Sequence, residues 1–316
     1  MADYLIRRLA ILAATLLFTA VMIFLVLEVL PGDPASIILG LDADQAALEA
    51  LRLKLGLDGP APLRFLGWFG DFVAGDLGTS YAFQIPVWQL VQERAAVTVP
   101  LALLASLLAL ALSLPAGLFA AINRNRVGDF SVMALSQVGL AVPNFWFAIL
   151  SILLFAVWLG WLPSGGFPGW NEGILVSLQA LILPALALAT GQAAILARMT
   201  RSSLLEVAEE DFMRTARAKG LTRRQALWRH GLRNALIPVV TLAGLQFGTL
   251  ITGTIVVEQV FSLPGMGRLI FQAIANRDLP LVKSLVMLFA VAVILINFLV
   301  DLLYVWIDPR LRTGHG

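Results

Sequence analysis

The sequence contains no cysteine, only two histidines and little charge. Without cysteine, the chain can form no disulfide, no thiol nucleophile and no thiolate metal site. The histidines, His230 and His315, lie in a basic segment and in the C-terminal tail. A metal enzyme or an intramembrane serine protease would therefore lack its ligands or its base. An aspartyl intramembrane protease is also disfavoured, because Asp301 has no acidic partner deep in an apolar run.

Charged residues make up 13% of the chain, against roughly 25% in ordinary globular proteins. Long uncharged runs cover residues 9–27, 95–122, 130–171, 173–197, 234–257 and 284–300. A membrane-spanning helix needs about 20 apolar residues. The third run is longer, but its segment "WLPSGGFPGW" at 161–170 holds two prolines that cannot continue a helix. We predict an all-α polytopic membrane protein in a lipid bilayer, with six transmembrane helices, the third covering about 130–160.

The positive charges predict the orientation of these helices, because Lys and Arg are retained on the cytoplasmic side during insertion. If the N-terminus lies inside, 15 of the 22 cations fall in cytoplasmic segments. Both termini are therefore expected in the cytoplasm. The first run is interpreted as a retained helix, because it is longer than the apolar core of a signal peptide and "EVLPGDP" offers no small-x-small cleavage site.

The segment 31–94, between the first two runs, is expected outside the membrane as a small helical cap. One helix is predicted over 44–56, with Asp44 as its N-cap and Gly56 at its end. A second amphipathic helix is predicted over 63–73. Its inward face is expected to comprise Leu66, Phe69 and either Phe72 or Val73. The resulting division is 1–94 (first helix and cap), 95–307 (transmembrane domain) and 308–316 (cytoplasmic tail).

The cytoplasmic segment 198–233 carries nine cations. The fourth helix is expected to continue past the membrane through Lys219 and to end at Gly220, which tolerates a left-handed backbone. Thr222 and Gln225 have the spacing of a capping box, so a second helix should start there and merge with the fifth span. Such a basic segment suits three roles: fixing topology and binding anionic lipid heads, reading DNA as a helix-turn-helix, or docking on a soluble partner. Nucleic-acid binding is disfavoured, because both helices run into membrane spans.

The segment "RTARAKGLTRRQALWRHGLRNALIPV" resembles the cytoplasmic EAA loop of ABC-importer permeases. Gly220 matches the central glycine of that loop, and Ala216 matches one of its alanines. The chain has Arg-Thr-Ala where the general pattern has Glu-Ala-Ala, and Leu232-Arg233 where it has Leu-Pro. These departures are typical of the dipeptide, oligopeptide and nickel branch. "LPGDPA", "LRLKLGLDGP", "GDLGTSY", "WLPSGGF" and "VVEQVFSLPGMGRL" also resemble that branch, so the likeness covers about the whole chain.

The resemblance implies the type I ABC-importer permease fold and a place in a larger complex of the bacterial inner membrane. The implied partners are a second homologous permease, two cytoplasmic ATPases and an external solute-binding protein. The implied cargo is di- or oligopeptides, with nickel complexes, glutathione, opines or other small solutes as alternatives. None of Lys54, Lys219 and Lys283 lies in a P-loop pattern. ATP and Mg²⁺ are therefore expected on partner subunits, with no catalysis and no cofactor on this chain.

The resemblance also indicates which residues meet the ATPases. These coupling residues are Arg214, Thr215, Ala216, Arg217, Ala218, Lys219, Gly220, Leu221, Arg223 and Arg224. Ala216 and Leu221 are expected to pack into a groove of the partner, and the arginines to meet its acidic or phosphate-proximal surface.

Polar residues inside spans are costly and usually face the bundle interior, so some of them are candidates for the translocation pathway. The candidates are Gln137, Asn144, Gln192, Gln246 and Glu258. Hydrogen bonding between helices, worth about 0.6–2 kcal/mol each, is the alternative role. A stand-alone secondary transporter is a distant alternative, because inverted repeats and buried ionisable relays are not evident.

Overall fold

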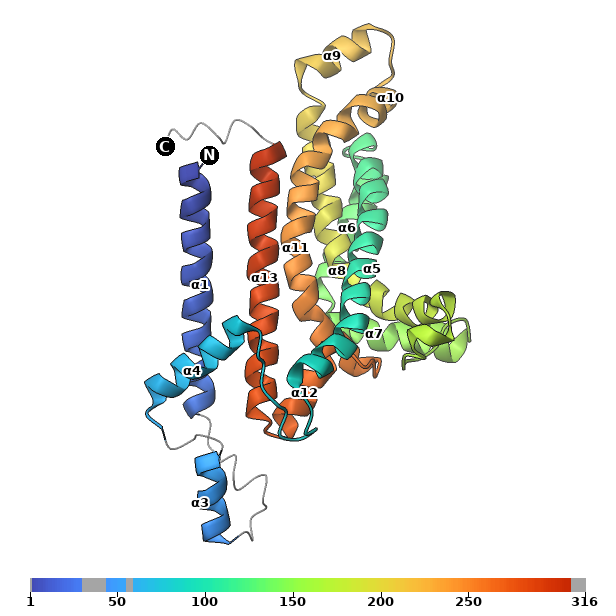
Figure 1. Ribbon diagram of the computed structural model, residues 1–316. Coiled ribbons are helices and arrows are strands. Elements are labelled where there is room, and N and C mark those ends of the chain that lie inside the picture. Colours follow the sequence, from blue (N-terminus) through green and yellow to red (C-terminus); the bar gives the residue numbers. More distant parts are fainter. Residues whose placement is uncertain (1, 30–43, 55–58, 308–316) are drawn as a thin grey trace. The chain divides into compact units, whose positions relative to one another are not determined.

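The computed structural model describes residues 2–29, 44–54 and 59–307 (Figure 1). It divides into two compact units. Unit 1 comprises Met1–Thr98 and Pro264–Leu295, and unit 2 comprises Val99–Leu263 and Ile296–Gly316. Two long helices contribute to both units, α5 (Val87–Ile122) and α13 (Leu279–Ile307). The division at residues 94 and 307 that the sequence suggests stays a prediction.

The remaining elements of unit 1 are α1 (Ala2–Val29), α3 (Gln45–Lys54), α4 (Ala61–Ala74) and α12 (Met266–Ala275). The predicted start of α3 is confirmed, because the Leu48 N–H donates to the Asp44 carbonyl at 3.0 Å. Its predicted end at Gly56 lies outside the described residues.

The predicted inward face of α4 is partly wrong. Leu66 is 62% exposed, and so is not an inward residue. The helix instead packs Phe65, Trp68, Phe69 and Phe72 against buried residues of α1 and α13. These four positions follow the i, i+3, i+4, i+7 spacing of one helical face, whereas Leu66 lies beside that face.

Unit 2 is a bundle of helices (Figure 1). Besides the shared helices it contains α6 (Val127–Ala141), α7 (Asn144–Ser151), η1 (Ile152–Trp158), η2 (Trp170–Glu172), α8 (Ile174–Val207), α9 (Asp211–Ala218), α10 (Arg223–Ala226), η3 (Leu227–Gly231) and α11 (Leu232–Val260). α8 packs against both α6 and α11. In Figure 1, α9 and α10 lie together at the end of unit 2 opposite α7.

The described residues contain five helices that are long and apolar enough to cross a membrane. They are Ile6–Glu28, Val87–Ile122, Ile174–Val207, Arg223–Val260 and Leu279–Leu302, which correspond to five of the six predicted spans. Where the sixth span was predicted, over about 130–160, the structure has α6 and α7 with η1, which meet at an angle of 102°, so the described residues reach six spans only if this bent pair counts as one. Pro143 causes the break, since it lacks an N–H and forces Val142 into an extended conformation with φ −83° and ψ 121°.

Two helical stretches were not expected. α5 starts eight residues before its apolar run, and this added stretch buries Val87, Leu90 and Val91. The stretch was not expected to be helical because charged residues separate it from the apolar run. α12 buries Leu269 and Ile270. Its ten residues are too few for a span, so the search for long apolar runs missed it.

α5 and α8 approach closely at Gly117. A β-carbon at this position would lie 2.5 Å from Cβ of Thr200 and 2.7 Å from the Ala197 carbonyl oxygen. Small residues allow such close contacts between membrane helices. Only glycine therefore fits at position 117 without moving the two helices apart.

Candidate functional site

The segment after α8 differs from prediction in one respect. The fourth helix was expected to run through Lys219, but α8 ends at Val207 and α9 begins at Asp211. Glu210, which precedes α9, is extended at φ −67° and ψ 150°. The acidic sequence explains the new start, because Asp211 in the first turn interacts favourably with the positive end of a helix dipole.

The break after α9 is confirmed at Gly220. This residue is left-handed at φ 95°. The Leu221 N–H donates to the Ala216 carbonyl at 3.4 Å, and the Gly220 N–H donates to the Arg217 carbonyl at 3.0 Å. These two bonds form a Schellman motif, which satisfies carbonyls at the end of a helix. The left-handed position favours glycine because it has no β-carbon to strain the backbone.

The predicted capping box starts the next helix. The Gln225 N–H donates to Oγ1 of Thr222 at 3.3 Å, and the Thr222 N–H donates to Oε1 of Gln225 at 2.9 Å. α10 then continues through η3, a π-helical turn, into α11, so Arg223–Val260 is one long helix. The segment from α9 to η3 therefore has a fixed break at Gly220, and it continues without interruption into α11.

We expect Thr222→Ala to destabilise the first turn of α10 by about 1 kcal/mol, because it removes the cap. Hydrogen–deuterium exchange of the Gln225 and Ala226 amides, which donate to Thr222, should become about fivefold faster, while exchange in α11 stays unchanged. Thr222→Ser keeps the hydroxyl and is the matched control. Equal exchange in the alanine and serine variants would contradict the role of the cap.

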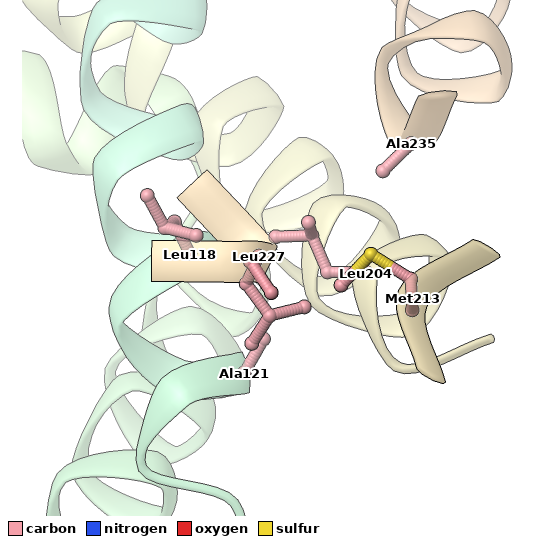
Figure 2. Close-up of a cluster of buried hydrophobic side chains, with 7 residues drawn as sticks. Leu118, Ala121, Leu204, Met213, Leu227 and Ala235 are labelled. Carbon is pink, nitrogen blue, oxygen red and sulfur yellow. The ribbon is translucent and has the colours of Figure 1, made fainter. Parts of the chain in front are cut away.

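An apolar cluster holds this element in place. Leu204 of α8, Met213 of α9 and Leu227 of η3 are buried together with Leu118 and Ala121 of α5. In Figure 2, the side chain of Leu227 lies among Leu118, Ala121 and Leu204. The segment from α9 to η3 is therefore packed on α5 and α8 of the bundle.

The coupling residues divide into two groups. Ala216 and Leu221 are half-buried against the cluster of this chain itself, so they help to anchor the element. Their contact with a partner's groove stays a prediction. The exposed members are Arg214, Thr215, Arg217, Ala218, Lys219, Gly220, Arg223 and Arg224. Such a surface, with five cations, is available to an acidic partner.

A buried ion pair lies between α6 and α8. Nε of Arg201 lies 2.5 Å from Oδ1 of Asp129, and Nη2 lies 2.7 Å from Oδ2. The Asp129 side chain is 3% exposed and also accepts the Asn125 N–H at 3.0 Å. This carboxylate therefore fixes the turn between α5 and α6 to α8. The sequence analysis missed the pair, because its partners are 72 residues apart.

Two pathway candidates are joined through a threonine. Nε2 of Gln192, on α8, donates to Oγ1 of Thr249 at 2.9 Å. The Thr249 hydroxyl donates to the backbone carbonyl of Gln246, one turn away on α11, at 2.7 Å, and it also lies 3.1 Å from Oε1 of that residue. Oε1 of Gln192 is buried without a hydrogen-bond partner. This group has the polarity to hydrogen-bond a solute, and it equally joins the two helices.

The other candidates lie elsewhere. Asn144 begins α7 and is half-buried beside Gly191 of α8, whose added β-carbon would lie 3.5 Å from Oδ1. Gln137 is exposed on α6. Glu258 of α11 is fully buried. Their roles in translocation stay predictions.

A polar centre in unit 1 was also missed. Asp278 is fully buried and accepts hydrogen bonds from the Ser80 hydroxyl, from the Ala82 N–H at 3.0 Å and from the Leu281 N–H at 3.3 Å. Burial, and then the charge of Asp278, raise the pKa of the neighbouring Tyr81 phenol. Ser80 belongs to the quoted "GDLGTSY" motif, which was the available signal. Asp278 therefore links the segment of Ser80 and Ala82 to the start of α13 through hydrogen bonds.

Within residues 2–29, 44–54 and 59–307, no three His, Cys, Asp or Glu side chains are grouped to hold a metal ion. The features of this part of the chain are instead long apolar helices and a basic, packed break between them.

Comparison with known proteins decides the family. Residues 113–313 match the family described as "Binding-protein-dependent transport system inner membrane component", and residues 1–102 match its N-terminal component. The chain belongs to this family. It is an ABC-importer permease, a multi-pass protein of the inner membrane, and its predicted place in the dipeptide, oligopeptide and nickel branch is confirmed.

Relatives of the permease match over nearly their full length. It is 43% identical over 312 residues to a Brucella abortus (strain 2308) protein provisionally named a peptide transport system permease, covering 99% of each chain. It is 42% identical, again over 99% of each chain, to the glutathione transport system permease protein GsiC of Escherichia coli (strain K12). Inward facing structures of the MetNI methionine ABC transporter give a TM-score of 0.58 at 21% identity, covering 70% of this chain and 97% of theirs. This last likeness supports the predicted fold.

Proposed function

We propose that the permease forms half of the translocation pathway of an ATP-driven importer of di- and oligopeptides. The relatives named above support this cargo, because one is named for peptides and the other for glutathione, which is itself a short peptide. Nickel complexes, opines and other small solutes are the alternatives. The observation that carries the coupling role is the basic break at Gly220, whose flanking helices pack on α5 and α8 and expose their cations.

The geometry suggests how force would enter the permease. An ATPase that binds the exposed residues around Gly220 would move α9 and α10 as it closes. The apolar cluster would pass that movement to α5 and α8, and the continuous helix from Arg223 would pass it to α11. Rigid-body transitions of this kind require stiff elements with defined connections. The break and the cluster supply both.

The proposal includes partners that this chain does not contain. Two cytoplasmic ATPases bind ATP and Mg²⁺, a second homologous permease completes the pathway as a heterodimer, and an external binding protein delivers the solute. The permease itself binds no cofactor and catalyses no reaction. Both termini lie in the cytoplasm, because this orientation places most of the cations inside.

The absence of cysteine allows a direct test of the coupling site. We expect Lys219→Cys, in the assembled complex, to cross-link to the ATPase through a short cysteine-reactive linker. Leu175→Cys is the matched control, because Leu175 is 80% exposed at the other end of α8. Cross-linking of the ATPase at Leu175→Cys and not at Lys219→Cys would overturn the proposed orientation and coupling site.

Uptake into proteoliposomes tests the cargo. The complete complex with its binding protein and ATP should import a labelled dipeptide or glutathione. Import of a nickel complex alone would replace the peptide assignment and leave the coupling site intact. Uptake by the permease alone, without ATPases, would favour the secondary-transporter alternative.

A further inference from the structure

A cavity of about 550 Å³ lies in unit 2 beside the coupling element, the segment from α9 to η3. One wall comes from the end of α5, including Leu114, Phe119 and Ile122. The other wall comes from α10 and η3, including Arg224 and Trp228. The residues that the coupling element needs for its break are therefore adjacent to an apolar groove.

The walls of the groove are apolar except for Arg224 and Gln225. Gln225 is already engaged in the capping box with Thr222. Arg224 is exposed and supplies the positive charge of the groove. A ligand that complements this site would combine a long apolar part with one anionic group.

The charges around the groove have the distribution of a membrane interface. The apolar run of α5 ends at Ile122, and Arg124 and Arg126 follow directly. On the other wall, Arg223 and Arg224 begin α10. Trp228 is 63% exposed, and tryptophan is enriched where hydrocarbon meets the polar headgroups. Apolar residues of α5 therefore line the groove, and Arg224 is the cation in its lining.

We propose that this groove binds one anionic phospholipid. An acyl chain lies along Leu114, Phe119 and Ile122, and the phosphate group pairs with Arg224. Basic pockets between membrane helices on the cytoplasmic side are known to suit anionic headgroups. The inference goes beyond the proposed function, since lipid binding here requires no particular cargo; it assigns Arg224 to the lipid and leaves the other exposed cations of the coupling residues to the ATPase.

The position of the site gives the lipid a role in coupling. Leu118 lines the groove and also belongs to the apolar cluster that holds the element. Trp228 lies in η3, and π-helical turns are frequent at functional sites. A bound lipid would fill the space between α5 and η3 and restrict the movement of α10 relative to α5.

Native mass spectrometry of the purified full-length chain tests the proposal with phosphatidylglycerol and phosphatidylcholine. We expect the unaltered chain to retain phosphatidylglycerol preferentially. Arg224→Gln should reduce that preference about fivefold, the effect of one interfacial cation. Ile122→Trp should reduce retention of both lipids by filling the groove. The matched controls are Arg217→Gln on α9 and Ile174→Trp at the far end of α8. Retention that is equal in all five proteins would overturn the proposal.

A second measurement distinguishes lipid from a protein occupant. Phe119→Cys is placed in this cysteine-free chain, labelled with a benzophenone maleimide and photolysed in the assembled complex with phosphatidylglycerol. An adduct with the mass of the lipid supports the proposal. An adduct with only the ATPase or the second permease would show that protein covers the groove and would overturn it.

Discussion

We expect the free energy of unfolding of the Arg201→Met variant to be about 3 kcal/mol lower than that of the unaltered permease. The substitution leaves the Asp129 carboxylate, which is 3% exposed, without its cation. Breaking a buried ion pair by removing one partner is strongly destabilising, because a charge stays out of water without compensation. The measurement is equilibrium unfolding of the purified protein in detergent with increasing denaturant.

Two further variants separate this effect from loss of the arginine itself. Arg201→Met combined with Asp129→Asn removes both charges while an amide oxygen still accepts the Asn125 N–H, so most of the stability should return. Arg124→Met breaks the ion pair between Arg124 and Glu209, whose two side chains are 43% and 72% exposed respectively. This change should lower the free energy of unfolding by less than about 1 kcal/mol. Equal losses from Arg201→Met and Arg124→Met would contradict a buried pair.

The Gly117→Ala variant is expected to lose about 2 kcal/mol of stability, within the usual range for overpacking. In an unobstructed helix the same change stabilises by roughly 0.5–1 kcal/mol, because alanine is the better helix former. At position 117 the added carbon meets the Ala197 carbonyl oxygen, which belongs to the backbone and cannot rotate away. The two helices must therefore separate.

Gly67→Ala on α4 is the control, because an added β-carbon there meets nothing within 4 Å. The unfolding temperature should fall for Gly117→Ala, and it should rise or stay the same for Gly67→Ala. The opposite signs distinguish helix packing from helix propensity. A stabilising Gly117→Ala would mean that α5 and α8 do not approach as described.

The parts of the fold that were predictable have local signals. Apolar runs predicted the long helices, because each run can bury itself in lipid without reference to the rest of the chain. The left-handed Gly220 and the capping box of Thr222 and Gln225 were also predictable, because their hydrogen bonds join residues at most five positions apart. Pro143 is a further local signal, because a proline inside an apolar run kinks or breaks a helix, and α6 and α7 with η1 meet there at 102°.

What could not be predicted depends on distant partners. Asp129 and Asp278 read as ordinary surface charges until the fold places Arg201 beside one and Ser80 beside the other. The exposure of Leu66 similarly depends on which face of α4 meets α1. Among the pathway candidates, the sequence named Gln192 and Gln246 but gave no reason to place Thr249 between them.

The make-up of unit 1 has a consequence for biosynthesis. Its first 98 residues form one unit with residues 264–295, and the Ser80 hydroxyl donates to a carboxylate that lies 198 positions later in the chain. Until Asp278 has been translated, Ser80 therefore lacks the carboxylate that accepts its hydroxyl. A chain truncated before residue 264 lacks one of the two stretches that form unit 1, so this unit can be completed only after the intervening bundle has been synthesised.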